Sequence, residues 1–132
     1  PPDTEIYVAD GLGELGLFYR LAGVGFVGGS LVPHGGQNLL EPARLDCAIL
    51  HGPHMANFEE IAGEMAGAGG SIRVETDDAL TNAVTALLTD ETMRSRSCEA
   101  AAAVARGKAR ILDAVVDEIA PYLDKAAQGA DA

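Results

Sequence analysis

Four short strand-like runs, of which the one at 47–50 is entirely apolar, alternate with segments of helical spacing, and this alternation restricts the fold more than any other feature of the chain. The runs span residues 6–9, 24–27, 47–50 and 71–74. Short, uniformly apolar runs suit strands that are buried on both faces of a parallel sheet. Strand–helix units joined by right-handed crossovers build an open sheet with helices on its faces. The sequence therefore predicts an α/β fold, a Rossmann-like open parallel sheet with flanking helices.

The segments between the runs carry apolar residues at helical spacing. We expect helices at about 13–21, 38–45, 57–65 and 77–88. Asn38, with Glu41 three residues later, has the pattern of a capping box. The next two helices have N-cap candidates in Asn57 and in Thr76 or Asp77.

The strand signal disappears after residue 90. Residues 91–123 are Ala-rich with helical spacing, and Gly107 is expected to separate two helices there. We assign residues 1–124 to one Rossmann-like domain that ends in this helical segment. Residues 125–132 are expected to be a disordered or frayed tail.

The charge balance narrows the kinds of partner that the chain can have. Lys and Arg number 9 against 20 Asp and Glu, which gives a net charge of -11. This balance disfavours nucleic acid and anionic membranes as partners, so any bound anion has to be held locally. The sequence shows no apolar run of membrane-spanning length and no signal-peptide pattern. Cys47 and Cys98 have neither metal-like nor redox-like spacing, which favours a reducing compartment.

Unusual loops follow three of the expected strands, at residues 10–14, 28–42 and 51–58. The middle loop contains four glycines and two prolines. Because the carboxyl ends of parallel strands share one edge of the sheet, we expect all three loops to lie together there, where ligands of such sheets bind. Helices that begin near this edge would direct free backbone amides towards a phosphate or a carboxylate.

Several residues of these loops have two interpretations. Gly35 and Gly36 fit a turn that needs positive φ, or a backbone that approaches a ligand closely. Glu41 fits a helix cap, or a carboxylate that accepts hydrogen bonds from ribose hydroxyls. Glu14 could simply favour the start of its helix. The residue types alone leave these alternatives open.

Two other kinds of site are less well supported by the sequence. His34, His51 and His54 lack an acidic or fourth ligand at close spacing, so we expect no metal site. Glycines 11, 13 and 16 match a dinucleotide-binding fingerprint after a strand, but the acidic residue expected at the end of the next strand is missing.

Four segments, read in order, are more specific. They are Asp-Gly-Leu-Gly-Glu-Leu at 10–15, Phe-Val-Gly-Gly-Ser-Leu at 26–31, Gly-Gly-Gln-Asn-Leu-Leu-Glu-Pro at 35–42 and Gly-Pro-His-Met-Ala-Asn-Phe at 52–58. Together they resemble the carboxy-terminal half of bacterial 3-deoxy-D-manno-octulosonic acid (Kdo) transferases, over about residues 5–90.

The resemblance implies a glycosyltransferase of GT-B architecture, in which two Rossmann-like domains face each other across a cleft. The carboxy-terminal domain would hold the donor CMP-Kdo. The amino-terminal domain would hold the lipid A precursor and the catalytic base. The implied reaction is an inverting Kdo transfer in lipopolysaccharide biosynthesis, without a metal or other cofactor, at the cytoplasmic face of the bacterial inner membrane.

The resemblance also assigns roles to residues of this chain. Near the phosphate or the Kdo carboxylate it places Ser30, Gly35, Gly36 and Asn38. Glu41 would bind the ribose, while Gly13, Glu14 and Asn57 would line the same cleft.

The chain departs from the family pattern at three positions. Gln37 stands where the family usually has His, Leu39 where it has Pro, and Gly11 where it has Thr. The Gln37 change argues against a proton-transferring imidazole there. The chain also begins with Pro1 and Pro2 and lacks any counterpart of the amino-terminal domain with its membrane-associating segment. We therefore expect a soluble piece of a longer protein that does not catalyse transfer alone and meets the membrane only through the other domain.

The sequence leaves three alternatives to a Kdo transferase domain. A related GT-B transferase that uses a UDP-sugar shares the Gly-Gly and Glu arrangement in outline. A non-catalytic nucleotide-binding module could keep the same fold. A dinucleotide-binding domain is the third alternative.

Overall fold

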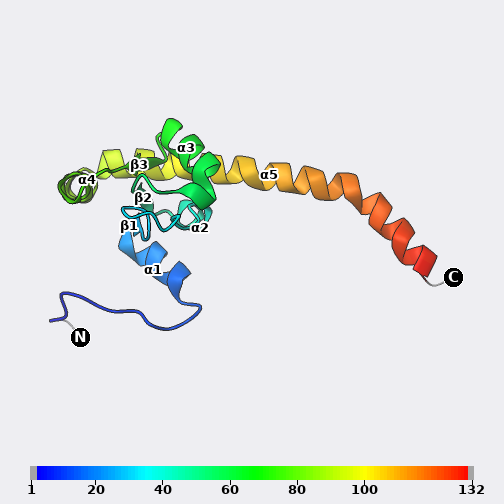
Figure 1. The fold of residues 1–132 in the computed structure, drawn as a ribbon, viewed down its shortest axis with the longest axis horizontal. Helices are drawn as coiled ribbons and strands as arrows, with labels where there is room; N and C mark the ends of the chain where they lie inside the picture. Colours follow the sequence, from blue (N-terminus) through cyan, green and yellow to red (C-terminus); the bar gives the residue numbers. More distant parts are fainter. Residues whose placement is uncertain (1–2, 131–132) are drawn as a thin grey trace.

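A three-stranded parallel sheet forms the centre of the domain (Figure 1). The computed structural model describes residues 3–130 and the side chains of residues 3–126. The strands are β1 (Val24–Val27), β2 (Ala48–His51) and β3 (Ser71–Arg73), side by side in the order β1-β2-β3. Val27 pairs with His51 and His51 pairs with Arg73, so the carboxyl ends of all three strands lie level at one edge.

Helices cover the sheet on both faces. They are α1 (Leu15–Ala22), α2 (Leu40–Arg44), α3 (Glu59–Gly67), α4 (Asp77–Thr89) and α5 (Glu91–Ala130), with a 3-10 turn, η1 (Ala56–Phe58), before α3. All four residues of β2 are buried. Ile49 packs into one hydrophobic cluster, while Ala48 and Leu50 pack into another. The alternation of side chains along β2 thus gives the sheet two buried faces, as the uniformly apolar run predicts.

The last three expected strands are confirmed to within one residue at each end, but the first is wrong. Residues 6–9 form no strand, and Ile6, Tyr7 and Val8 are exposed. In Figure 1 this segment lies beyond α1, away from the sheet. A strand needs a neighbour whose backbone groups pair with its own. The described part of the chain supplies no such neighbour, so the segment stays outside the sheet.

The expected break at Gly107 is also wrong, because α5 is continuous from Glu91 to Ala130. A single helical glycine costs only about 1 kcal/mol relative to alanine, and the alanines on either side favour the helix. Small residues of α5, including Ala101 and Ala105, are buried against the sheet and α2. The helix continues through Pro121 into the segment expected as a tail, whose last residues, 131–132, lie outside the described residues.

The caps agree only in part with the sequence. Thr76 is the N-cap of α4, and its hydroxyl accepts a hydrogen bond from the Ala79 amide at 3.1 Å. Asn57 does not cap α3, because it lies inside η1 and α3 begins two residues later. The Asn38–Glu41 capping box is not formed either, since α2 begins only at Leu40.

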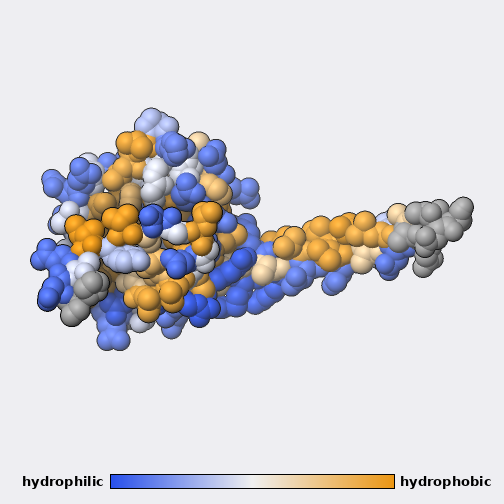
Figure 2. Space-filling model, turned by 90° about the horizontal axis from the view of Figure 1, so that it is seen from below, coloured by the Kyte–Doolittle hydropathy of each residue, from blue (hydrophilic) through white to orange (hydrophobic). Residues whose placement is uncertain are grey.

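The second half of α5 extends beyond the body of the domain (Figure 1) and carries an apolar stripe, visible in Figure 2. Its exposed residues are Ile111, Leu112, Val115, Val116, Ile119, Tyr122 and Leu123. Nothing in the described part of the chain covers this stripe. None of the described helices combines the length and the apolarity that crossing a bilayer requires.

Candidate functional site

Two of the three expected loops meet at the carboxyl edge of the sheet. We call residues 28–36 and 51–57 the loop pair. Three hydrogen bonds join them: the Gly52 amide donates to Ser30 Oγ at 2.8 Å, the His54 amide to the Ser30 carbonyl at 2.9 Å, and the Asn57 amide to the Gly35 carbonyl at 3.3 Å. The expectation that these loops share one edge is therefore confirmed for this pair.

Ser30 is the centre of the loop pair. Its side chain is fully buried, and its hydroxyl donates to the Val27 carbonyl while it accepts from the Gly52 amide. The hydroxyl proton is thus already used, and only one lone pair remains for a ligand. Ser30 joins the end of β1 to the start of the second loop and so fixes the shape of this edge.

Gly35 and Gly36 are required by the backbone. Their φ angles are 98° and 72°, a region that favours glycine, and both residues are buried. A Cβ atom at Gly35 would overlap the Asn57 side chain, and one at Gly36 would overlap the Met55 sulfur. The turn interpretation of these glycines is therefore confirmed. Their close approach to a ligand stays a prediction.

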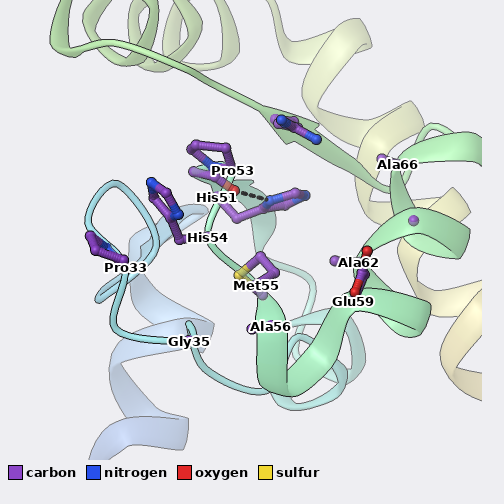
Figure 3. Close-up of a pocket in the computed structure, with 13 residues that line it drawn as sticks. Pro33, Gly35, His51, Pro53, His54, Met55, Ala56, Glu59, Ala62 and Ala66 are labelled. Atoms are coloured by element: carbon purple, nitrogen blue, oxygen red, sulfur yellow. Dashed lines mark hydrogen bonds between the residues drawn. The ribbon is translucent and has the colours of Figure 1, made fainter.

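A pocket of about 550 Å³ opens beside the loop pair (Figure 3). Its lining residues are Pro33, Gly35, His51, Gly52, Pro53, His54, Met55, Ala56, Glu59, Ala62, Gly63, Ala66 and Arg73. Of the eight residues that the sequence suggested for donor binding, only Gly35 lines it. His51, Glu59 and Arg73 are polar residues of the pocket that the sequence reasoning did not assign to donor binding. The sequence could have pointed to two of them, His51 and Arg73, because they stand at strand ends.

Four of the suggested residues lie outside the loop pair: Gly13 and Glu14 just before α1, Asn38 just before α2, and Glu41 in α2. We call residues 10–14 and 38–41 the α1–α2 face. Glu41 is exposed, and α1 passes beside it: a Cβ atom at Gly16 would lie 3.8 Å from Glu41 Oε1. Burial raises the pKa of Tyr19 on the same helix, and the Glu41 carboxylate and Cys47 raise it further. The Glu41 carboxylate is exposed and makes no ion pair within residues 3–126, so it can accept hydrogen bonds from a ligand.

Gly13 and Glu14 are exposed at the start of α1. No hydrogen bond within the described residues connects them to the loop pair. Asn38 is exposed as well, and its Oδ1 accepts from the Leu40 amide at 2.9 Å. The structure thus joins Ser30, Gly35, Gly36 and Asn57 in the loop pair, whereas no hydrogen bond within the described residues connects Asn38, Glu41, Gly13 or Glu14 to it.

Neither a reactive thiol nor a metal-binding cluster is found among the described residues of this region. Burial raises the pKa of the Cys47 thiol to about 11, with Cys98 and Asp46 adding to the effect, so the thiol stays protonated and unreactive near neutral pH. Within residues 3–130 no three His, Cys, Asp or Glu side chains are grouped closely enough to hold a metal ion.

The parallel strands, the flanking helices and the hydrogen-bonded loops at the carboxyl edge define the class of protein. It is a Rossmann-like α/β domain, and its loops are joined at the edge where ligands of such sheets bind. No family model matches the chain. It is 38% identical to the 3-deoxy-D-manno-octulosonic acid transferase of Haemophilus influenzae over 124 residues, which are 93% of this chain and 29% of that protein. It is 34% identical to the Bordetella pertussis transferase of the same name over 120 residues, 88% of this chain and 28% of that protein.

A solved structure agrees with these relatives. The crystal structure of the C-terminal CMP-Kdo binding domain of WaaA from Acinetobacter baumannii matches with a TM-score of 0.73 and 34% identity, over 76% of this chain and 53% of that chain. These matches confirm the resemblance read from the sequence: the chain is homologous to part of the Kdo transferases. It spans less than a third of the length of the two relatives.

Proposed function

We propose that the chain is the donor-binding part of a Kdo transferase of GT-B architecture, and that its ligand is CMP-Kdo. The observation that carries this proposal is the loop pair at the carboxyl edge of the sheet, within a fold that matches a CMP-Kdo binding domain. In this proposal the acceptor is a lipid A precursor, and the amino-terminal domain supplies both the acceptor site and the catalytic base at the cytoplasmic face of the inner membrane.

The roles of the residues follow from the chemistry of the donor. The acceptor hydroxyl attacks the anomeric carbon of Kdo, its proton goes to the base of the other domain, and the bond to the CMP phosphate breaks. Negative charge then develops on the phosphate, which backbone amides stabilise best. Gly35 and Gly36 let the backbone of the loop pair approach that phosphate, with Asn38 at the start of α2 beside it.

Glu41 binds the ribose in this proposal. Its carboxylate accepts hydrogen bonds from the two ribose hydroxyls, as acidic residues do in nucleotide sites. Gly13 and Glu14 line the cleft from the start of α1. Ser30 and Asn57 act mainly by holding the two loops together, because Ser30 Oγ and the Asn57 amide are used in contacts between them.

Calorimetric titration of the chain with CMP, UDP and NAD tests the donor. We expect CMP to bind best, and Glu41→Ala to weaken CMP binding about tenfold, the loss of hydrogen bonds to a charged group. The control is Glu99→Ala, which removes an exposed carboxylate on α5 and should leave CMP binding unchanged. A preference for UDP would favour a UDP-sugar transferase, and tight NAD binding would overturn the proposal.

A second experiment tests whether the catalytic base lies outside this chain. The purified chain, mixed with CMP-Kdo and a lipid A precursor, should transfer no Kdo, because the base lies outside it in this proposal. Product detected by mass spectrometry, and absent with heat-denatured chain, would show that the catalytic base is among these residues.

A further inference from the structure

His51 is a buried polar residue that the donor-binding roles above leave unused. It ends β2, is 2% exposed and lines the pocket beside the loop pair. Its Nδ1 lies 2.8 Å from the Gly52 carbonyl oxygen. A carbonyl oxygen only accepts, so in the neutral ring the proton is on Nδ1 and Nε2 has a free lone pair.

That lone pair has no partner within the described residues. Nε2 of His51 is buried and makes no hydrogen bond. A buried acceptor without a donor costs about 1–3 kcal/mol, so such an atom calls for an explanation. In Figure 3 the ring extends from the strand end towards the side of the pocket formed by Ala62 and Ala66. A ligand O–H or N–H group is the partner that would satisfy it.

Arg73 adds a positive charge to the same pocket. It is the register partner of His51 on β3, so the two side chains leave the sheet on the same face. Its guanidinium pairs with Glu75 at 2.8 Å, and both side chains are more than half exposed. Exposed ion pairs contribute little free energy, so Arg73 can exchange this partner for an anion in the pocket.

The size and walls of the pocket suit a sugar. A volume of about 550 Å³ lies within the range of small-molecule sites. Pro33, Pro53 and Met55 provide apolar surface for the faces of a ring, and Glu59 provides a further acceptor. Pro33, Gly35 and residues 51–56 belong to both the loop pair and the pocket wall. A sugar attached to a phosphate at the loop pair would therefore reach the pocket directly.

We propose that this pocket holds the sugar part of the donor, with His51 Nε2 accepting a hydrogen bond from a sugar hydroxyl and Arg73 facing the sugar carboxylate. This inference rests on the proposed function, since it presumes a donor phosphate at the loop pair. It makes His51 and Arg73 the residues of this chain that select a hydroxylated acidic sugar.

Nuclear magnetic resonance of the histidine side chains tests the contact directly. A long-range ¹H–¹⁵N spectrum of the ¹⁵N-labelled chain reports the hydrogen bonding of each ring nitrogen. Adding CMP-Kdo, or free Kdo, should move the His51 Nε2 signal upfield, whereas CMP should leave it in place. CMP is the matched control, because it carries the phosphate without the sugar. If neither CMP-Kdo nor free Kdo moves the His51 Nε2 signal, the inference is wrong, and the hydrogen-bond partner of Nε2 is a bound water only.

Calorimetry on variants provides the second arm. His51→Phe keeps a ring of similar size but removes the acceptor, so CMP-Kdo affinity should fall about tenfold while CMP affinity stays the same. Arg73→Gln should likewise lower the affinity for CMP-Kdo and leave the affinity for CMP unchanged. Equal affinities for CMP-Kdo in the wild type and both variants would contradict the inference. If CMP does not bind but free Kdo still moves the His51 Nε2 signal, the nucleotide part of the proposed function is wrong. The inference about the sugar pocket is then still supported.

Discussion

The loop pair and the α1–α2 face are held in place by different means. The loop pair is joined by three hydrogen bonds between segments about twenty residues apart, and Ser30, Gly35 and Gly36 are buried within it. On the α1–α2 face, Gly13, Glu14, Asn38 and Glu41 are exposed. The bonds there are local, such as those from the Leu17 and Phe18 amides to the Glu14 carbonyl.

This difference separates two ways in which a site residue can matter. A residue of the loop pair supports the fold as well as any ligand, so its replacement should lower the free energy of unfolding. A residue of the α1–α2 face makes only local contacts, so its replacement should lower the free energy of unfolding by about 1 kcal/mol at most, while any role in the ligand site would appear in binding. The following substitutions test this division by denaturant unfolding, starting with the largest expected effect.

Gly52 is the position in the loop pair with the least room. A Cβ atom there would overlap the Ser30 carbonyl and lie 2.6 Å from the Leu31 amide nitrogen, and backbone atoms cannot move aside as a flexible side chain can. Gly52→Ala should therefore lower the free energy of unfolding by about 3 kcal/mol. The matched control is Gly28→Ala, where a Cβ atom meets nothing within 4 Å. Equal stability of the two variants would show that the loops are not held in contact.

Ser30 should give the next largest effect. Ser30→Ala removes the acceptor of the buried Gly52 amide and the donor to the Val27 carbonyl, which should cost about 2 kcal/mol. Ser95→Ala on the exposed face of α5 should change stability by less than about 0.5 kcal/mol. A Ser30→Ala chain as stable as wild type would mean that this hydroxyl serves the ligand rather than the loops.

The sequence predicted the loop pair because the information is local. Apolar runs mark the strands, glycines mark the loops that follow, and the parallel arrangement brings those loops to one edge. The contact between Ser30 and Gly52 follows from the structure, in which the strands before them are parallel neighbours. The α/β class and the last three strands follow from the same pattern.

Other features depend on partners that periodicity does not reveal. Residues 6–9 have the composition of a strand, but a strand also needs a neighbour to accept its hydrogen bonds. The pairing of His51 with Arg73 is a matter of register between strands that are distant in sequence. Gly107 looked like a helix break, yet the packing of Ala101 and Ala105 where α5 contacts the sheet and α2 outweighs its low helix propensity.

Asn38 lies on the α1–α2 face and should show a smaller effect. Its Oδ1 accepts from the Leu40 amide at the start of α2, a local bond at an exposed site. Asn38→Ala should cost about 1 kcal/mol, the usual net contribution of one hydrogen bond. Asn82→Ala, at an exposed position inside α4, removes an asparagine with no capping role and should be neutral or slightly stabilising. A loss comparable with that of Gly52→Ala would place Asn38 with the loop pair instead.

Glu14 should show the smallest effect on stability, and it tests the division most sharply. It precedes α1 as the N-cap residue, but its side chain makes no capping hydrogen bond, and the carbonyl that accepts from Leu17 and Phe18 remains after Glu14→Ala. The free energy of unfolding should therefore stay within about 0.5 kcal/mol of wild type. In the same samples, CMP binding should weaken if Glu14 lines the donor cleft. A loss of stability well above that limit would mean that residues 10–14 are fixed by the fold in the same way as the loop pair, and the two regions would then differ only in exposure.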